Sequence, residues 1–164
     1  MNYVGITKAS FVNGEGVRTV LWVSGCVHHC EECHNPYTWN PDSGMEFTDE
    51  IEKELFDVLD RPIIDGITIS GGDPLYIYNR HIITRLCKRI RYKYNDTKTI
   101  WVYTGYLWEQ VKILNIMQYI DVLVDGPYRK GLESIKWCGS SNQRVIDVQK
   151  SLQSNEVVLY GEKK

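Results

Sequence analysis

The sequence predicts an α/β protein whose sheet is mainly parallel, with helices packed outside it. Predicted strands and helices alternate along the chain, each strand is a short apolar run, and most of these runs end at a glycine-containing loop. Alternation of this kind indicates βαβ units, which build parallel sheets. The chain has 164 residues without internal repeats or a linker. We therefore expect a single domain over residues 1–164.

The overall charge and hydropathy exclude two classes of partner. The formal net charge is −2, whereas a nucleic-acid partner calls for a clustered basic surface. The basic residues at 88–93 suit the last turns of a solvated helix. The N-terminus lacks the pattern of a signal peptide, and no apolar run approaches the length of a membrane span. We expect a cytoplasmic protein that binds neither nucleic acid nor membrane.

The first half of the chain contains two predicted strands with a helix between them. Residues 19–23 form an apolar run that ends at Gly25. Thr48 is a predicted N-cap. The helix after it has apolar residues at helical spacing, namely Ile51, Leu55, Val58 and Leu59. Residues 66–70 are the second predicted strand.

The second half continues the alternation. A helix is predicted after Pro74, with the inner face Ile82, Ile83, Leu86, Cys87 and Ile90. It is followed by predicted strands at 99–103 and 121–125, with a helix at 107–117 between them. Residues 128–143 are predicted to be irregular. Short closing strands are predicted at 144–148 and 156–160.

Each predicted strand of the parallel sheet ends in an unusual loop. Cys26 follows the first strand, Gly71-Gly72-Asp73-Pro74 the second, Thr104-Gly105 the third and Asp125-Gly126 the fourth. Parallel sheets place their ligands at the carboxyl ends of the strands. The four loops are therefore expected to build one site.

Three cysteines in eight residues indicate a metal site. Cys26, Cys30 and Cys33 are spaced Cys-x3-Cys-x2-Cys, and thiolates are soft ligands for iron-sulfur clusters and zinc. Three thiolates on a four-iron cluster leave one iron free for a substrate, whereas ferredoxins normally use four cysteines. The alternative is a zinc site completed by His28, His29 or His34.

The remaining two cysteines are read differently. Cys87 lies on the inner face of a predicted helix and is expected to be a small core residue. Cys138 is isolated in the sequence and is assigned no role. His28 and His29 are expected to be exposed, or to tune the potential of the cluster through hydrogen bonds or charge, rather than to bind metal.

These residues resemble the radical S-adenosylmethionine superfamily, whose hallmark is this triad spacing. Gly71-Gly72-Asp73-Pro74 is similar to that superfamily's Gly-Gly-Glu-Pro turn, with Asp in place of Glu. The resemblance implies a 4Fe-4S cluster held by the triad and S-adenosylmethionine bound at its open iron. It also implies an incomplete (βα) barrel, because 164 residues are short for a full one, which needs about 250.

The same resemblance suggests roles around the cofactor. It implies that Gly71, Gly72 and Asp73 seat the methionine end, with Thr104 and Asp125 as further contacts. The alternatives are a turn residue for Thr104 and a turn or helix cap for Asp125. Many members carry an adenine-facing aromatic residue where this chain has Glu32. His34 is therefore the predicted replacement, with Tyr37 as the alternative.

Further segments resemble one branch, the activases of glycyl radical enzymes. Residues 13–18 are similar to the start of those activases, and residues 137–144 to a late motif of the proteins that activate anaerobic ribonucleotide reductase. The resemblance implies one-electron cleavage of S-adenosylmethionine to methionine and a 5′-deoxyadenosyl radical, which removes a hydrogen atom from a glycine. The implied partners are the large reductase subunit and an external one-electron reductant such as flavodoxin.

Three other functions stay open at this point. The chain is also compatible with an activase of a different glycyl radical enzyme, such as pyruvate formate-lyase. A small-substrate radical enzyme of deazapurine biosynthesis shares the triad, although residues 137–144 argue against it. A non-enzymatic zinc or iron-sulfur interaction module is the third, and metal analysis of anaerobically purified protein separates it from the enzymes.

Overall fold

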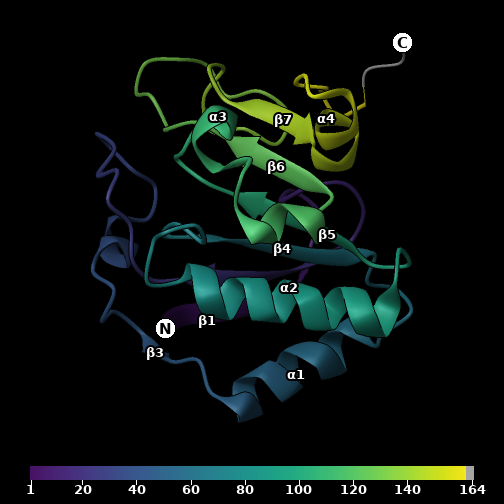
Figure 1. The fold of residues 1–164 in the computed structure, drawn as a ribbon. Helices are drawn as coiled ribbons and strands as arrows, with labels where there is room; N and C mark the ends of the chain where they lie inside the picture. The colour runs from purple at the N-terminus through teal and green to yellow at the C-terminus, as the bar shows by residue number, and fades with distance from the viewer. Residues whose placement is uncertain (162–164) are drawn as a thin grey trace.

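The strands form one seven-stranded sheet in the order β3-β1-β2-β4-β5-β6-β7 (Figure 1). The structure is a computed structural model that describes residues 1–161. Strands β2, β4, β5 and β6 are parallel, and the outer strands join them antiparallel. The sheet is not closed, so the predicted α/β class is confirmed at the level of an open sheet with a parallel centre. The strands are β1 (Asn2–Ser10), β2 (Arg18–Val23), β3 (Met45–Glu46), β4 (Gly66–Gly71), β5 (Thr99–Tyr103), β6 (Val122–Asp125) and β7 (Arg144–Asp147).

The four central strands lie where the sequence predicts them, to within one residue at each end. The sequence did not predict β1 and β3, the two strands at the edge of the sheet opposite β7. β1 mixes polar residues with a glycine and is only partly buried, so it lacks the apolar run that marks the central strands. β3 is two exposed residues long, which is too short for any periodic pattern.

The two longer helices confirm the helical spacing of the sequence. α1 (Asp49–Leu59) begins after Thr48, whose Oγ1 accepts a hydrogen bond from the amide of Ile51 at 3.4 Å. α2 (Arg80–Tyr94) begins six residues after Pro74 because a turn-rich segment comes between them. Both helices lie on the same side of the central strands (Figure 1).

Two predictions near the C-terminus need correction. The helix predicted at 107–117 is split into α3 (Trp108–Val111) and the 3₁₀ helix η2 (Asn115–Gln118). The strand predicted at 156–160 is wrong, since only Leu159 forms a bridge, with Ile146. A helix that was not predicted, α4 (Val148–Ser154), follows β7 directly, and the Asp147 carboxylate caps it by accepting from the amide of Lys150 at 3.1 Å.

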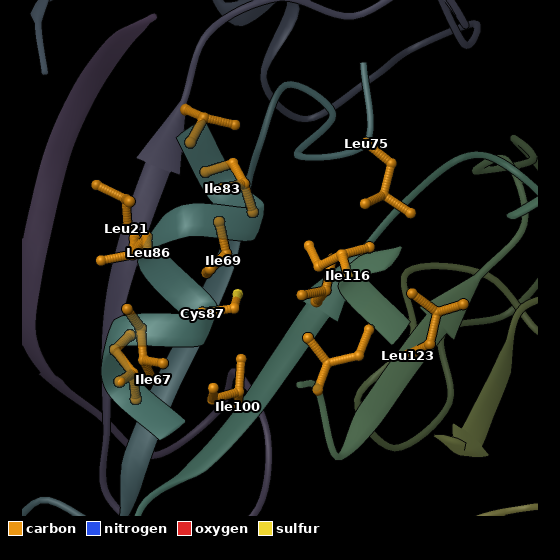
Figure 2. Packing of buried hydrophobic residues seen from close by; sticks show 14 of the residues in the cluster. Leu21, Ile67, Ile69, Leu75, Ile83, Leu86, Cys87, Ile100, Ile116 and Leu123 are labelled. Atoms are coloured by element: carbon orange, nitrogen blue, oxygen red, sulfur yellow. The ribbon is translucent and has the colours of Figure 1, made fainter. Parts of the chain in front are cut away.

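The two faces of the central strands have different neighbours. Leu21, Ile69 and Val102 are fully buried and pack in the core against α1 and α2. Figure 2 shows Cys87 of α2 within this core, as the sequence predicts. The residues next to them, Trp22 and Tyr103, point to the other face and line a cavity. The period of two in the strands thus separates the core from the cavity.

Among residues 1–161, no helix has the length and apolar character that crossing a membrane requires.

Candidate functional site

The carboxyl ends of the four parallel strands surround one cavity of about 610 Å³. Its lining includes residues from all four strand-end loops, as the alternation of strands and helices predicts. The lining residues from those loops include Cys26, Cys30, Cys33, Gly71, Gly72, Thr104 and Gly126. The three cysteines and the glycine turn, which are about 40 residues apart in sequence, therefore face the same space.

The three cysteines lie on a tightly turning loop whose start is fixed to its surroundings. The amide of Cys26 donates to the carbonyl of Trp39 at 3.1 Å, and the amide of Cys33 donates to that of Cys30 at 3.1 Å. His29 and Glu32, the residues just before Cys30 and Cys33, have φ angles of 46° and 52°. These left-handed conformations turn the chain sharply before each of the two cysteines. All three cysteines are free and partly buried.

Burial and backbone hydrogen bonds shift the pKa values of the Cys26 and Cys30 thiols in opposite directions. Burial raises the pKa of Cys26 to about 11, and backbone hydrogen bonds from His28 and His29 act in the opposite direction. Burial also raises the pKa of Cys30, against a backbone hydrogen bond from Tyr128. Amide donors directed at sulfur stabilise a thiolate, so the loop offers partners that a metal-bound sulfur can use.

The positions of the three cysteines can be compared with the needs of a single metal ion and of an iron-sulfur cluster. Within the described part of the chain, no three His, Cys, Asp or Glu side chains are close enough to hold a single ion. The three cysteines instead lie around the wall of the cavity. In an iron-sulfur cluster the cysteines bind different irons, so they need not converge on one point. Three thiolates that face one cavity are, in kind and number, donors that suit such a cluster.

The two glycines of the turn pack against the strand that leads to the cysteines. A Cβ atom at Gly71, where φ is +107°, would lie 2.6 Å from the carbonyl oxygen of Val23, and one at Gly72 would lie 2.6 Å from that of Gly25. The amides of Gly72 and Asp73 donate to these two carbonyls, both at 2.7 Å. The absence of side chains thus lets the turn lie directly on the end of β2.

Asp73 has a buried carboxylate that is bound by its own chain. It accepts from the amide of Leu75 at 2.8 Å, the hydroxyl of Thr104 at 2.9 Å and the amide of Gly105 at 3.0 Å. The ring of His28 reaches the same carboxylate. Among described residues, Gly71, Gly72 and Thr104 line the cavity and Asp73 does not. Its direct contact with a cofactor stays a prediction.

Asp125 is also fully buried and bound within the chain. Its carboxylate accepts from the amide of Trp108, the first residue of α3, at 2.7 Å, and from Nε of Arg144 at 3.0 Å. Arg144 in turn pairs with Glu109 at 3.1 Å. The contacts are those of a helix cap, which the sequence left as an alternative. A contact between Asp125 and the cofactor stays a prediction.

The structure separates the two candidates for the adenine-facing ring. His34 lines the cavity, and its ring lies 4.8 Å from that of Tyr128. Tyr37 is 66% exposed and its hydroxyl accepts from the amide of Gly44. Glu32, at the position where an aromatic residue was expected, pairs with Lys130 at 2.7 Å. His34 is thus the better placed of the two, and its role stays a prediction.

Two features, one in the site and one at the opposite end of the sheet, were not assigned from the sequence. Cys138 and its neighbour Trp137 both line the cavity, and Trp137 has a φ of 64°. Away from the cavity, at the amino-terminal end of β2, Arg18 is fully buried and donates to Glu15, Ile67, Thr68 and Thr99. In the sequence, Arg18 was marked only by its place in the segment 13–18, which resembles the start of the activases.

Comparisons with known proteins agree with this site. Residues 12–146 match a family described as a 4Fe-4S single cluster domain, and this range includes all three cysteines. Curated relatives carry the name anaerobic ribonucleoside-triphosphate reductase-activating protein. The one from Enterobacteria phage T4 is 46% identical over 88% of this chain and 93% of its own length. Those from Escherichia coli K12 and Pasteurella multocida are 42% and 39% identical, over 97% and 95% of their lengths and 88% and 87% of this chain.

Proposed function

Since the chain belongs to the family of anaerobic ribonucleoside-triphosphate reductase-activating proteins, we propose that it generates a glycyl radical on the large subunit of an anaerobic ribonucleotide reductase. The observation that carries the proposal is the shared cavity: three cysteines and the loops of four parallel strands line one space of about 610 Å³. This is the place where open parallel sheets bind their ligands.

In this proposal Cys26, Cys30 and Cys33 hold a 4Fe-4S cluster, and S-adenosylmethionine binds beside it. When bound, these cofactors supply the one-electron cleavage that produces a radical able to remove a hydrogen atom from glycine. The chain supplies ligation, orientation and exclusion of water. The three cysteines are themselves partly buried where they line the cavity, which supports the last of these roles.

The residues that face the cavity support specific roles for the cofactor contacts. Gly71 and Gly72 offer the backbone of the turn to the methionine end, and Thr104 lies at the adjoining strand end. His34 is proposed to contact the adenine. Asp73 and Asp125 stay predictions as cofactor contacts, because their carboxylates are already bound within the chain.

We infer that the open sheet is the incomplete (βα) barrel of the radical S-adenosylmethionine superfamily, in one domain over residues 1–164. An unclosed sheet leaves lateral access to the cavity, which suits a substrate that is itself a protein loop. An external one-electron reductant such as flavodoxin would complete the reaction. A cytoplasmic location belongs to the same proposal, since free thiols persist in reducing compartments.

The test is anaerobic reconstitution with iron, sulfide and reductant, followed by S-adenosylmethionine and the candidate reductase. We expect about four irons per chain, release of 5′-deoxyadenosine and a glycyl radical signal in electron paramagnetic resonance. Cys30→Ala should abolish all three. Cys87→Ala is the matched control, because Cys87 is a core residue and should leave the cluster intact.

The outcomes distinguish the proposal from its alternatives. A radical that forms on pyruvate formate-lyase but not on the reductase would assign the chain to a different activase. Cleavage of S-adenosylmethionine without a radical on either pyruvate formate-lyase or the reductase would favour a small substrate. One zinc per chain without cofactor cleavage would identify a non-enzymatic module and overturn the proposal.

A further inference from the structure

His28 joins the loop between the first two cysteines to a carboxylate on another strand end. Its Nε2 lies 2.7 Å from Oδ2 of Asp73, a residue 45 positions further along the chain. The His28 side chain is 16% exposed and that of Asp73 is 1% exposed. The hydrogen bond is thus shielded from water, which makes it stronger than a surface contact.

The ring of His28 is held on two further sides. It packs edge to face against Tyr106, with centroids 4.6 Å apart. It also fills the space beside Gly105, where a Cβ atom would lie 2.4 Å from the ring. Because these neighbours come from the loop after β5, the ring position is defined by packing as well as by the hydrogen bond.

Asp73 is itself fixed, so that it can act as an anchor. Its carboxylate also accepts from Thr104 and from the amides of Leu75 and Gly105. Its carbonyl accepts from the side chain of Asn79 at 3.1 Å, which also donates to Ser24. The carboxylate therefore joins the loops that follow β4 and β5, and His28 connects the cysteine loop, which follows β2, to this junction.

The neighbours of His28 in the same loop have different surroundings. Val27 and His29 are exposed, and the ring of His29 stacks on Trp39 at 4.6 Å. The structure records no hydrogen bond from the His29 side chain to a carboxylate among the described residues. His29 is therefore a natural control, since it lies in the same loop, directly beside Cys30, and has the same side chain.

We propose that His28 is a positioning residue for Cys26 and Cys30. Through Asp73 it holds the span between these cysteines against the glycine turn, so that the two sulfurs keep the separation that a cluster requires. The inference rests on the proposed function, in which the triad binds the cluster. Residues that orient metal ligands in this way typically change metal affinity 10- to 100-fold when they are replaced.

The test compares His28→Leu and His28→Gln with His29→Leu and His29→Gln. Gln can place its amide near the position of Nε2 and donate to Asp73, whereas Leu cannot. After anaerobic reconstitution, iron per chain and the rate of iron loss to a chelator are measured. We expect loss about tenfold faster or more for H28L, an intermediate rate for H28Q, and the wild-type rate for both His29 variants.

A second measurement examines the protein without metal. Alkylation of the thiols is followed by mass spectrometry at each cysteine, together with thermal melting. In H28L we expect faster alkylation of Cys26 and Cys30, with no change at Cys87. Because H28Q is less disruptive than H28L, its comparison with H29Q keeps the test valid where H28L folds poorly.

Different results would overturn the role of His28 and the proposed function. Wild-type rates of iron loss and alkylation in H28L would overturn the role of His28 while the cluster remains. An H28Q variant as impaired as H28L, or a His29 variant as impaired as either, would also overturn it. Wild-type protein that takes up no iron would overturn the proposed function itself.

Discussion

Gly72 lies so close to Gly25 that a Cβ atom on Gly72 would be 2.6 Å from the carbonyl oxygen of Gly25. A second backbone atom, the carbonyl oxygen of Thr38, would be 2.9 Å away. Gly25 immediately precedes Cys26. The turn after β4 and the start of the cysteine loop therefore share one backbone contact, which only glycine allows.

Gly72→Ala should consequently destabilise the protein and impair iron binding together. Both obstructing atoms belong to the backbone and cannot rotate away, so the loop must shift, at a cost of roughly 1–3 kcal/mol. Chemical denaturation and iron content after reconstitution measure the two effects. Gly5→Ala is the control, because a Cβ atom there has no neighbour within 4 Å; equal effects of the two changes would contradict this explanation.

Arg18→Lys should lower stability without affecting the cluster of the folded protein. The guanidinium makes five hydrogen bonds and lies 5.2 Å from the ring centre of Trp101, whereas an ammonium has three donors. Loss of two charged hydrogen bonds costs roughly 3 kcal/mol. At this chain length the melting temperature should fall by roughly 6–12 °C.

The location of Arg18 explains why the cluster should be spared. Arg18 begins β2, and the cysteines follow the other end of the same strand. Iron content measured well below the melting temperature should match that of the wild type. The exposed Arg61→Lys change is the matched control and should leave both stability and iron unaltered. Loss of iron in folded R18K would show that the two ends of the sheet are coupled.

Local patterns made much of the fold and the cysteine site predictable. Strands β2, β4, β5 and β6 are buried on both faces, so they appear as apolar runs. Cys26, Cys30 and Cys33 belong to one short loop, so their closeness in space follows from their spacing in the sequence. Parallel order then requires the loops after the strands to meet at one edge, which is why the shared cavity followed from the alternation alone.

Contacts between distant residues made the rest unpredictable. Whether the carboxylate of Asp73 faces a ligand or His28 depends on the packing of loops 45 positions apart, and no local pattern records this. The two glycines predict a close approach of backbone to a ligand, and no local pattern records that they also pack against the backbone at Val23 and Gly25. β1 has a mixed pattern because it is only partly buried.

Asp125→Asn should destabilise the protein through the loss of a helix cap and an ion pair. The carboxylate is fully buried and bonds both the amide of Trp108 and the guanidinium of Arg144. Replacing it with a neutral amide should cost about 2 kcal/mol. Glu109→Gln removes the exposed partner of the same arginine and should cost less than about 1 kcal/mol.

Equilibrium binding of S-adenosylmethionine to reconstituted D125N decides whether Asp125 also contacts the cofactor. We expect an affinity close to that of the wild type, because the carboxylate already accepts three hydrogen bonds from two groups of the chain, the Trp108 amide and the Arg144 guanidinium. A clear loss of affinity in the folded variant would restore Asp125 as a cofactor contact. In that case the cap and the binding role would coexist in one side chain.

The core thiol of Cys87 should make the protein sensitive to alkaline pH. Burial raises the pKa of Cys87 from 9.0 to about 12, while nearby Arg91 lowers it and Asp121 raises it. Between these values the unfolded chain has released a proton that the folded chain keeps. The free energy of unfolding must therefore fall as pH rises above 9, by up to about 1.4 kcal/mol per pH unit for this group.

Cys87→Ala isolates this contribution. The pKa values of Cys26 and Tyr103 are also raised by burial, so the stability of the wild type and of the variant should decline as pH rises. The contributions of Cys26 and Tyr103 cancel when the two free energies of unfolding are subtracted. At pH 7 the variant should be less stable by roughly 1 kcal/mol because a buried atom is lost. Urea denaturation of the reduced, metal-free proteins from pH 7 to 10.5 should show that the difference in free energy of unfolding between wild type and variant shrinks above pH 9. Parallel curves over that range would mean that Cys87 ionises as readily in the folded chain as in the unfolded one.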